Sequence, residues 1–475
     1  MNILNARQLP EDRLTTTDEK GHRVYIHPAD VRGRFRKWRA FIHAGMILFF
    51  LILPWIRIGG HQAVLLDIPH RRFALFGLTF WAHDAPILLF VFGAIALTIG
   101  FITALWGRIW CGWGCPQTVF VEGVFRRIER WVEGDSVARR SLSRQPWTFE
   151  KFWKKVFKWA LFAAAGMVIT HSFLAYFVGT EDLLKMMRSS PYQNPAPFLF
   201  MIAATALVLF DFGWFREQFC TIVCPYGRFQ SVLMDDHSLV IAYDAKRGEP
   251  RRGKTEEGQK EGDCVNCFRC VDVCPTGIDI RRGVQLECIA CTACIDACDE
   301  VMERLERPQG LIRYDSLLGL EGEPSRSLSP RTWVYLALIG VMIAGLVFTI
   351  YRRQNLDVAF VRAKEAPYQE MKKGDAAEIV NHYKVDLSNQ SFEDVQLRFE
   401  TDPSLVAENF KLITPLVPLP LPAGKSVRAD LFVEFPKSAL KDGRAKVRVQ
   451  LVSLSEKTGK ETKRTEEIPL VGPFF

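Results

Sequence analysis

Cysteine is the residue type in this sequence with the richest chemistry, because a thiolate binds soft metals and takes part in redox reactions. The chain has twelve cysteines, and all of them fall between Cys111 and Cys298 in four short groups. Eight form two runs with the spacing C-x₂-C-x₂-C-x₃-C, namely Cys264, Cys267, Cys270, Cys274 and Cys288, Cys291, Cys294, Cys298. This spacing is the signature of bacterial ferredoxins that hold two [4Fe–4S] clusters. The sequence therefore predicts two clusters that carry electrons one at a time.

Each run is expected to share its ligands between the two clusters. Gaps of two residues let three thiolates of a looping backbone converge on one cluster, while the fourth cysteine ligates the other. On this logic the ligands are Cys264, Cys267, Cys270 and Cys298 for cluster I, and Cys274, Cys288, Cys291 and Cys294 for cluster II. Structural zinc is the alternative. Zinc sites use four ligands, typically as two pairs of cysteines, and the double run is far more typical of iron–sulfur.

The remaining four cysteines form two C-x₃-C-P motifs at the ends of apolar stretches. Cys111 and Cys115 form the first, Cys220 and Cys224 the second, 109 residues later, which indicates an internal duplication. In a helix the i, i+4 spacing would place both sulfurs of a pair on one face, although Gly112 and Gly114 weaken this interpretation. Four thiols at one membrane depth could bind copper(I), zinc or iron–sulfur, or do thiol redox chemistry. Buried, inert cysteines are the alternative.

Other ionisable groups give weaker signals. His43, His171 and Asp211 lie within apolar stretches, where such groups are often functional. The two histidines could ligate a haem, but a hydrogen bond between packed helices explains them more simply. The chain has no C-x-x-C-H, G-x-G-x-x-G or phosphate-binding loop motif, so we predict no covalent haem, nicotinamide or ATP site.

Apolar and charged segments alternate along the 475 residues, of which 48% are hydrophobic and 24% charged. Five apolar stretches reach the roughly 20 residues that a membrane-spanning helix needs. They run approximately over Ala40–Ile58, Pro86–Trp106, Val156–Val178, Pro197–Phe215 and Trp333–Tyr351. Buried helices of a soluble protein are the alternative, but several of these stretches carry almost no charge. The sequence therefore predicts an α-helical membrane protein with five spans.

Basic residues indicate how the spans are oriented. The segment 107–155 holds ten Lys or Arg, whereas the loops between spans one and two and between spans three and four hold two each. Because basic loops stay in the cytoplasm, we expect the N-terminus and the cysteine-rich segment there and the C-terminal segment outside. The net charge of +8 is explained by these flanks, so no nucleic-acid partner is expected. The first 39 residues show no signal-peptide pattern.

The C-terminal segment changes character from about residue 354. The stretches 378–388, 395–400, 426–435 and 445–454 alternate apolar and polar residues, the pattern of half-buried strands. About 120 residues of short strands predict an all-β immunoglobulin-like sandwich, which we interpret as a docking or spacer domain. The expected divisions are an N-terminal tail (1–39), a four-span domain (40–235), a ferredoxin-like domain (236–332), a fifth span (333–351) and the β domain (354–475).

The ordered set of CGWGCP, CTIVCP, CVNCFRCVDVCP and CIACTACIDAC, with five spans and a β domain without cysteine, resembles the FixG/CcoG/RdxA family over essentially the whole chain. These are accessory proteins of cbb3-type cytochrome c oxidase in bacterial inner membranes. The resemblance implies reduction of Cu(II) to Cu(I) for the oxidase's copper centre, with the clusters as electron relay. It also implies Cys111, Cys115, Cys220 and Cys224 as copper or thiol sites, and oxidase subunits and copper transporters or chaperones as partners.

Two other functions stay open. The span-edge motifs and the ferredoxin segment also resemble NapH, which would imply a quinol dehydrogenase subunit that supplies a periplasmic reductase. A scaffold for oxidase assembly or a membrane redox sensor is the non-enzymatic alternative. The fifth span and the outer β domain favour the oxidase accessory family.

Overall fold

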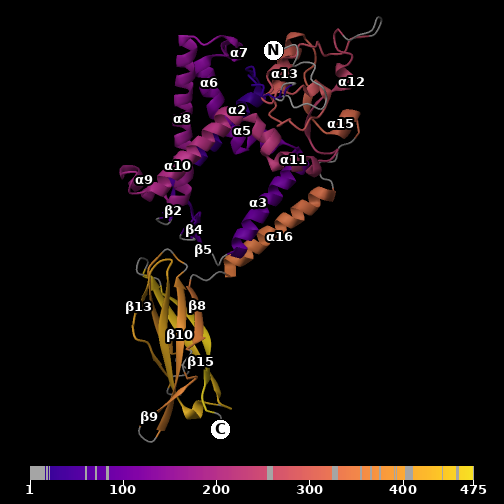
Figure 1. The fold of residues 1–475 in the computed structure, drawn as a ribbon. Coiled ribbons are helices and arrows are strands. Elements are labelled where there is room, and N and C mark those ends of the chain that lie inside the picture. Colours follow the sequence, from indigo (N-terminus) through magenta and orange to yellow (C-terminus); the bar gives the residue numbers. More distant parts are fainter. Residues whose placement is uncertain are drawn as a thin grey trace. The chain divides into compact units, whose positions relative to one another are not determined.

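The computed structural model describes most of the chain, which forms two units (Figure 1). The first unit comprises 1–65 and 86–347, and the second 66–85 and 348–475. The residues described are 16–17, 20, 22–58, 61–69, 72–81, 85–253, 260–323, 330–352, 356–363, 366–373, 376–389, 391, 393–401, 410–440, 442–455, 459 and 461–473.

Among the residues that the structure describes, five helices are long and apolar enough to cross a membrane, which confirms the five predicted spans. They are α2 (Arg34–Ile52), α3 (Ala85–Trp106), α8 (Phe149–Val178), α10 (Pro195–Val208) with its π-helical continuation η4 (Leu209–Phe215), and α16 (Pro330–Arg352). All five begin earlier than the apolar pattern indicates, and α2 and α8 do so by more than one helical turn. The α8 helix starts at Phe149 because Thr148 caps it, its hydroxyl accepting a hydrogen bond from the Lys151 nitrogen at 3.3 Å.

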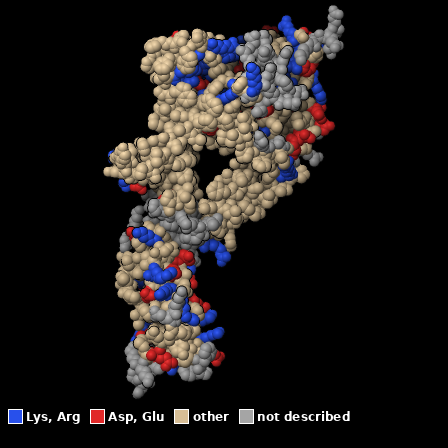
Figure 2. Space-filling view, viewed as in Figure 1, with Lys and Arg blue, Asp and Glu red and all other residues tan. Residues whose placement is uncertain are grey.

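Short helices connect these spans. Those between α3 and α8 are α4 (Ile109–Trp113), α5 (Pro116–Phe120), η3 (Val121–Phe125), α6 (Arg126–Glu133) and α7 (Ser136–Arg144). Those on either side of α10 are α9 (Thr180–Arg188), η5 (Phe219–Val223) and α11 (Pro225–Leu233). In Figure 2 charged residues gather at the end of the first unit that carries α6, α7 and α12, and they are sparse over α3, α10 and α16.

The cysteine-rich segment folds around a two-stranded antiparallel sheet, β6 (Val240–Tyr243) with β7 (Ile312–Asp315). Its helical elements are α12 (Ala245–Gly248), α13 (Arg269–Asp272), η6 (Ile280–Arg282), α14 (Ala293–Arg304) and α15 (Leu317–Glu321). Ile241, Ile278, Ile295 and Met302 form a buried core that includes several of the cysteines. The cysteine loops are therefore held against an apolar interior.

The second unit contains a sandwich of two antiparallel sheets, as predicted. One sheet has the order β12 (Lys411–Ile413), β14 (Ser426–Pro436), β10 (Ala376–Asn389), β8 (Leu356–Arg362), with β9 (Gln369–Lys373) also on β10. The other has the order β13 (Leu419–Leu421), β11 (Val395–Thr401), β15 (Arg444–Ser455), β16 (Glu461–Val471).

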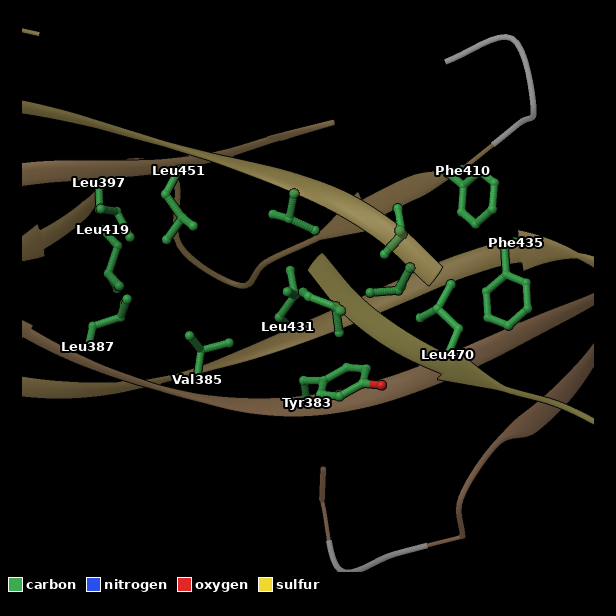
Figure 3. Close-up of a cluster of buried hydrophobic side chains, with 14 of the residues drawn as sticks. Tyr383, Val385, Leu387, Leu397, Phe410, Leu419, Leu431, Phe435, Leu451 and Leu470 are labelled. Atoms are coloured by element: carbon green, nitrogen blue, oxygen red, sulfur yellow. The ribbon is translucent and has the colours of Figure 1, made fainter. Parts of the chain in front are cut away.

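The core of this sandwich lies between the two sheets (Figure 3). Tyr383, Val385 and Leu387 alternate along β10 and point inward, where they meet residues of the facing sheet such as Leu397 and Leu451. The four strands expected from alternation are β10, β11, β14 and β15, and all four are confirmed.

Several strands were not predicted. The loop between the first two spans forms the small strands β1 (Arg57–Ile58), β2 (His61–Gln62), β3 (Val64–Asp67), β4 (Arg72–Leu75) and β5 (Leu78–Trp81). In the sandwich, β16 has charged residues at most of its first seven positions, so its buried Ile468 and Leu470 give too short a pattern to recognise.

Candidate metal centres

The two cysteine runs have the same backbone conformation at matching positions. Asn266 and Phe268 in the first run have φ of 55° and 59°, and Ala290 and Thr292 in the second have φ of 51° and 65°. Left-handed backbone is uncommon in residues other than glycine and is typical of functional sites. Here it curls each loop around a centre, so that side chains of successive cysteines turn toward the same point. The spacing signature is thus matched by a repeated loop geometry.

The structure gathers the eight cysteines around two neighbouring cavities. Cys264, Cys267, Cys270 and Cys298 line one cavity. Cys274, Cys288, Cys291 and Cys294 line the other, which Cys270 also reaches. In each case the fourth cysteine of one run joins the first three of the other run. These are the groupings expected from the sequence, and binding of a cluster by each individual cysteine stays a prediction.

The residues around the cavities fit [4Fe–4S] clusters. Cys264, Cys270 and Cys291 are buried, and burial raises the pKa of the Cys288 thiol to about 12, so buried thiolates here require a cationic partner. Among the described residues, no three Cys, His, Asp or Glu side chains are placed to ligate one metal ion. Four cysteines around a cavity are the arrangement that a cluster of several atoms needs.

The two C-x₃-C-P motifs share a local structure, but it is not the expected helix. Cys115 and Cys224 have extended backbone and cap the helices α5 and α11, whose first residue is the proline of the motif. Each of these cysteines donates its backbone N–H to the carbonyl five residues earlier, Trp110 or Phe219, at 2.8 Å. Placement of each pair on one helical face is therefore wrong. Proline ends the preceding hydrogen-bonding pattern and starts a new helix at its own position.

The structure nevertheless brings all four membrane-edge cysteines together. The pKa of the Cys220 thiol is raised first by burial and then by the nearby Cys115, Cys111 and Cys224. Burial likewise raises the pKa of Cys111 to about 11, although Gln230 donates a hydrogen bond to its sulfur at 3.1 Å. The four are thus a cluster of half-buried thiols, which we call the membrane-edge thiols.

These thiols adjoin the loop of cluster II. Cys111 packs against a buried group that contains Ile289 and Cys291. A Cβ atom at Gly112 would lie 2.5 Å from the Ile289 carbonyl oxygen, so only glycine allows the two loops to approach this closely. Trp113 donates its indole N–H to the Ala290 carbonyl at 3.3 Å. The first motif and the second cysteine run therefore form one packed interface.

Arginines from two elements hold the same loop. Arg39 of α2 is buried and donates to the Cys291 carbonyl at 2.7 Å. Arg108 donates to the carbonyls of Leu286 and Cys288 and, at 2.7 Å, to that of Gly227 beside the second motif. The sequence marks Arg108 as the arginine that precedes the first motif, three residues before Cys111, but it predicts no contact for it. Arg39 was not singled out from the sequence.

The weaker candidates have local partners. His43 Nε2 lies 3.3 Å from the Gly112 carbonyl oxygen, and His171 Nδ1 lies 2.8 Å from the Met167 carbonyl of its own helix. Asp211 accepts a hydrogen bond of 2.9 Å from the side chain of Gln117, which follows Cys115 by two residues. Asp211 and His43 therefore both lie next to the first motif.

Comparison with known proteins finds relatives that are similar in sequence over most of this chain. Protein RdxA of Cereibacter sphaeroides is 36% identical over 396 residues, which cover 80% of this chain and 83% of that protein. The chain belongs to the FixG/RdxA family. The nitrogen fixation protein FixG of Rhizobium meliloti is 37% identical over 62% of this chain and 57% of its own length. The ferredoxin-type protein NapH of Haemophilus influenzae is 25% identical over 51% of this chain and 87% of its own length.

Family models account for three segments of this FixG/RdxA-family chain. A 4Fe-4S dicluster domain matches 215–317, and the IG-like fold at the C-terminal of FixG matches 346–473. A second 4Fe-4S binding domain matches 86–134, where Cys111 and Cys115 are the cysteines present. The chain is therefore an iron–sulfur electron-transfer protein with membrane-spanning helices and an immunoglobulin-like domain.

Proposed function

We propose that this chain reduces Cu(II) to Cu(I) at the membrane-edge thiols and thereby supplies copper for the assembly of a cbb3-type cytochrome c oxidase. It would act in a bacterial inner membrane, with the cysteine-rich segment in the cytoplasm and the β domain in the periplasm. The chemistry balances, because Cu(II) takes up one electron and each [4Fe–4S] cluster supplies one when reduced. The product is the copper ion that thiolates prefer.

The packing of Cys111 against the buried group that contains Ile289 and Cys291 is the observation that carries this proposal. It supports a continuous path from the cytoplasm. Cys267 is exposed, Cys270 lines both cluster cavities, and Cys291 lies in the buried group that Cys111 contacts. Along this path the protein supplies the ligands, excludes water and holds the thiols against the second cluster loop.

The test follows electrons from the clusters to copper. The protein is purified anaerobically in detergent and chemically reduced, and Cu(II) is added with a Cu(I)-specific chelator while the cluster absorbance is recorded. We expect cluster reoxidation with one Cu(I) formed per electron lost. Cys115→Ser and Cys224→Ser should abolish Cu(I) formation and keep the cluster spectrum. Thr221→Ser, inside the second motif but without loss of a thiol, is the matched control. Full activity in both cysteine variants would rule out the proposed site.

Quinol oxidation is a second candidate, favoured by a cavity of about 250 Å³ beside cluster II. Its lining includes Cys288, the apolar Leu286 and Leu317, and the carboxylates of Asp235 and Asp236. A quinol gives up two electrons and two protons, so the two clusters would take one electron each and the carboxylates would accept protons. This function would be favoured if Cu(II) does not reoxidise the reduced clusters but a quinone analogue does.

A further inference from the structure

Another cavity in the first unit has several arginines in its lining. It lies where the N-terminal segment, α2, α6 and the cluster II loop meet. Five arginines line it, namely Arg36, Arg39, Arg126, Arg127 and Arg130, against the two carboxylates of Asp30 and Glu122. Its lining therefore carries a formal excess of three positive charges. We call it the arginine cavity.

The carboxylates present do not satisfy these arginines. Glu122 is shared by three of them, contacting Arg126 closely and lying 3.6 Å from Arg39 and 3.9 Å from Arg36. Asp30 pairs with Arg130 at 3.0 Å. Because one carboxylate has about four lone-pair sites and three guanidiniums have fifteen N–H donors, most donors are left to other acceptors.

Two of the donors are buried without a partner. Arg39 is 3% exposed and Arg126 is 7% exposed. The Nε of each is buried and has no hydrogen-bond partner among the residues that the structure describes, although their terminal nitrogens bond to Cys291, Pro275 and Glu217. A buried N–H of a charged group without an acceptor is costly, and both of these side chains line the arginine cavity.

We propose that the arginine cavity binds a phosphate group. Phosphate offers several anionic oxygens to converging guanidiniums, the geometry in which arginine is used most. The cavity has a volume of about 50 Å³. A single water needs about 10–15 Å³ on that measure, so the cavity has room for a group of a few heavy atoms, with the rest of the ligand outside.

Two sources can present this group at the cytoplasmic end of α2. One is inorganic phosphate or another soluble phosphate. The other is the headgroup of an anionic lipid, since Trp38 and Phe41 are 63% and 71% exposed within one turn of Arg39. Either would bind next to Val273, Pro275 and Ala293, which flank ligands of cluster II. This site stands on its own and does not depend on copper chemistry.

The experiment uses the full chain in detergent and two probes. Thermal unfolding is measured with inorganic phosphate and with chloride at equal ionic strength, and retention of phosphatidylglycerol against phosphatidylcholine is measured by native mass spectrometry. Stabilisation by inorganic phosphate identifies a soluble source. Selective retention of phosphatidylglycerol without that stabilisation identifies a lipid headgroup.

The double variant Arg36→Gln/Arg127→Gln should weaken whichever response is found by about tenfold or more, the effect of losing one charge-assisted hydrogen bond. Arg304→Gln removes a charge from an exposed position on α14 and should leave it unchanged. If the double variant does not fold, the single variant Arg127→Gln, at an exposed residue, replaces it. No response to either probe, or equal responses in wild type and variant, would overturn the proposal.

Discussion

The carboxylate of Asp296 lies 2.7 Å from the backbone nitrogen of Arg36, although the two residues are 260 positions apart. Asp296 stands on α14 between Cys294 and Cys298, and Arg36 is in the first turn of the membrane helix α2. The same carboxylate accepts a second hydrogen bond from the Phe35 nitrogen at 3.2 Å. The cluster-binding segment thus caps a membrane helix, which ties the clusters to the membrane domain.

Replacing this cap should loosen the attachment. We expect Asp296→Ala to lower the free energy of unfolding by about 1–2 kcal/mol, because two N–H groups at the start of α2 lose their acceptor. Asp296→Asn should lose less. Loss of cluster absorbance on heating in detergent measures the effect, with Glu303→Ala, an exposed position on the same helix, as control. An unfolding temperature equal to that of wild type in Asp296→Ala would contradict this role.

The buried ion pair between Glu129 and Arg216 should be sensitive to loss of one partner. The two side chains form two hydrogen bonds, of 2.5 and 3.0 Å, and both are almost fully buried. Arg216→Met should therefore destabilise the protein by up to about 3–5 kcal/mol, reduced to the extent that Lys158 and Arg139 still neutralise Glu129. The double variant Glu129→Leu/Arg216→Met should recover part of this. Denaturant unfolding compares the three, and a double variant no more stable than Arg216→Met would argue against the pairing.

Acid should weaken the same network. Arginine and lysine neighbours hold the pKa of Glu129 at about 2 in spite of its burial, below its ordinary value of 4.5. A lowered pKa stabilises the folded state above the ordinary pKa, and this contribution is lost as the pH falls from about 4.5 toward 2. Tryptophan fluorescence during unfolding should show a steeper loss of stability over this range in wild type than in Glu129→Gln. Parallel profiles would show that Glu129 does not contribute.

Gly112 should matter through the space it leaves. An alanine there would press on the Ile289 carbonyl oxygen, so Gly112→Ala should cost about 1–3 kcal/mol or displace the cluster II loop. We expect Cu(I) formation to slow while the iron content stays constant. Gly45→Ala, whose added methyl meets nothing within 4 Å, is the matched control. Equal rates of Cu(I) formation in the two variants would show that the contact between Gly112 and Ile289 is not part of the electron path.

Cysteine variants should reveal which run serves which cluster. Cys298→Ser should remove the same cluster as Cys264→Ser, and Cys274→Ser the same cluster as Cys288→Ser, because each cavity combines three cysteines of one run with one of the other. Electron paramagnetic resonance of the remaining cluster distinguishes the two outcomes. Cys115→Ser should keep all the iron. A loss of iron in Cys115→Ser would instead assign iron–sulfur binding to the first membrane-edge motif.

Much of this molecule follows from local patterns in the sequence. The length of apolar stretches predicted five spans, because a bilayer sets a minimum length for any helix that crosses it. Alternation predicted the central strands β10, β11, β14 and β15, which are buried on one face. The edge strand β16 was not predicted, because it has few buried residues and lies in a charged stretch. A proline after Cys115 and Cys224 was a readable signal that the helix is interrupted, and the expected i, i+4 geometry overlooked it.

By itself, the sequence determined the iron–sulfur chemistry. The cysteines of each run are only a few residues apart, so their spacing sets the geometry of the loop that binds a cluster. Only the tertiary structure decided which distant groups meet. The contact of Gly112 with Ile289, the cap of α2 by Asp296 and the gathering of Arg39 with Arg126 join residues that are far apart in the chain. Such meetings depend on how whole helices pack, and no local spacing specifies that packing. The cysteine spacing alone therefore predicts the clusters. The candidate copper and phosphate sites consist of residues that come together only in the folded chain.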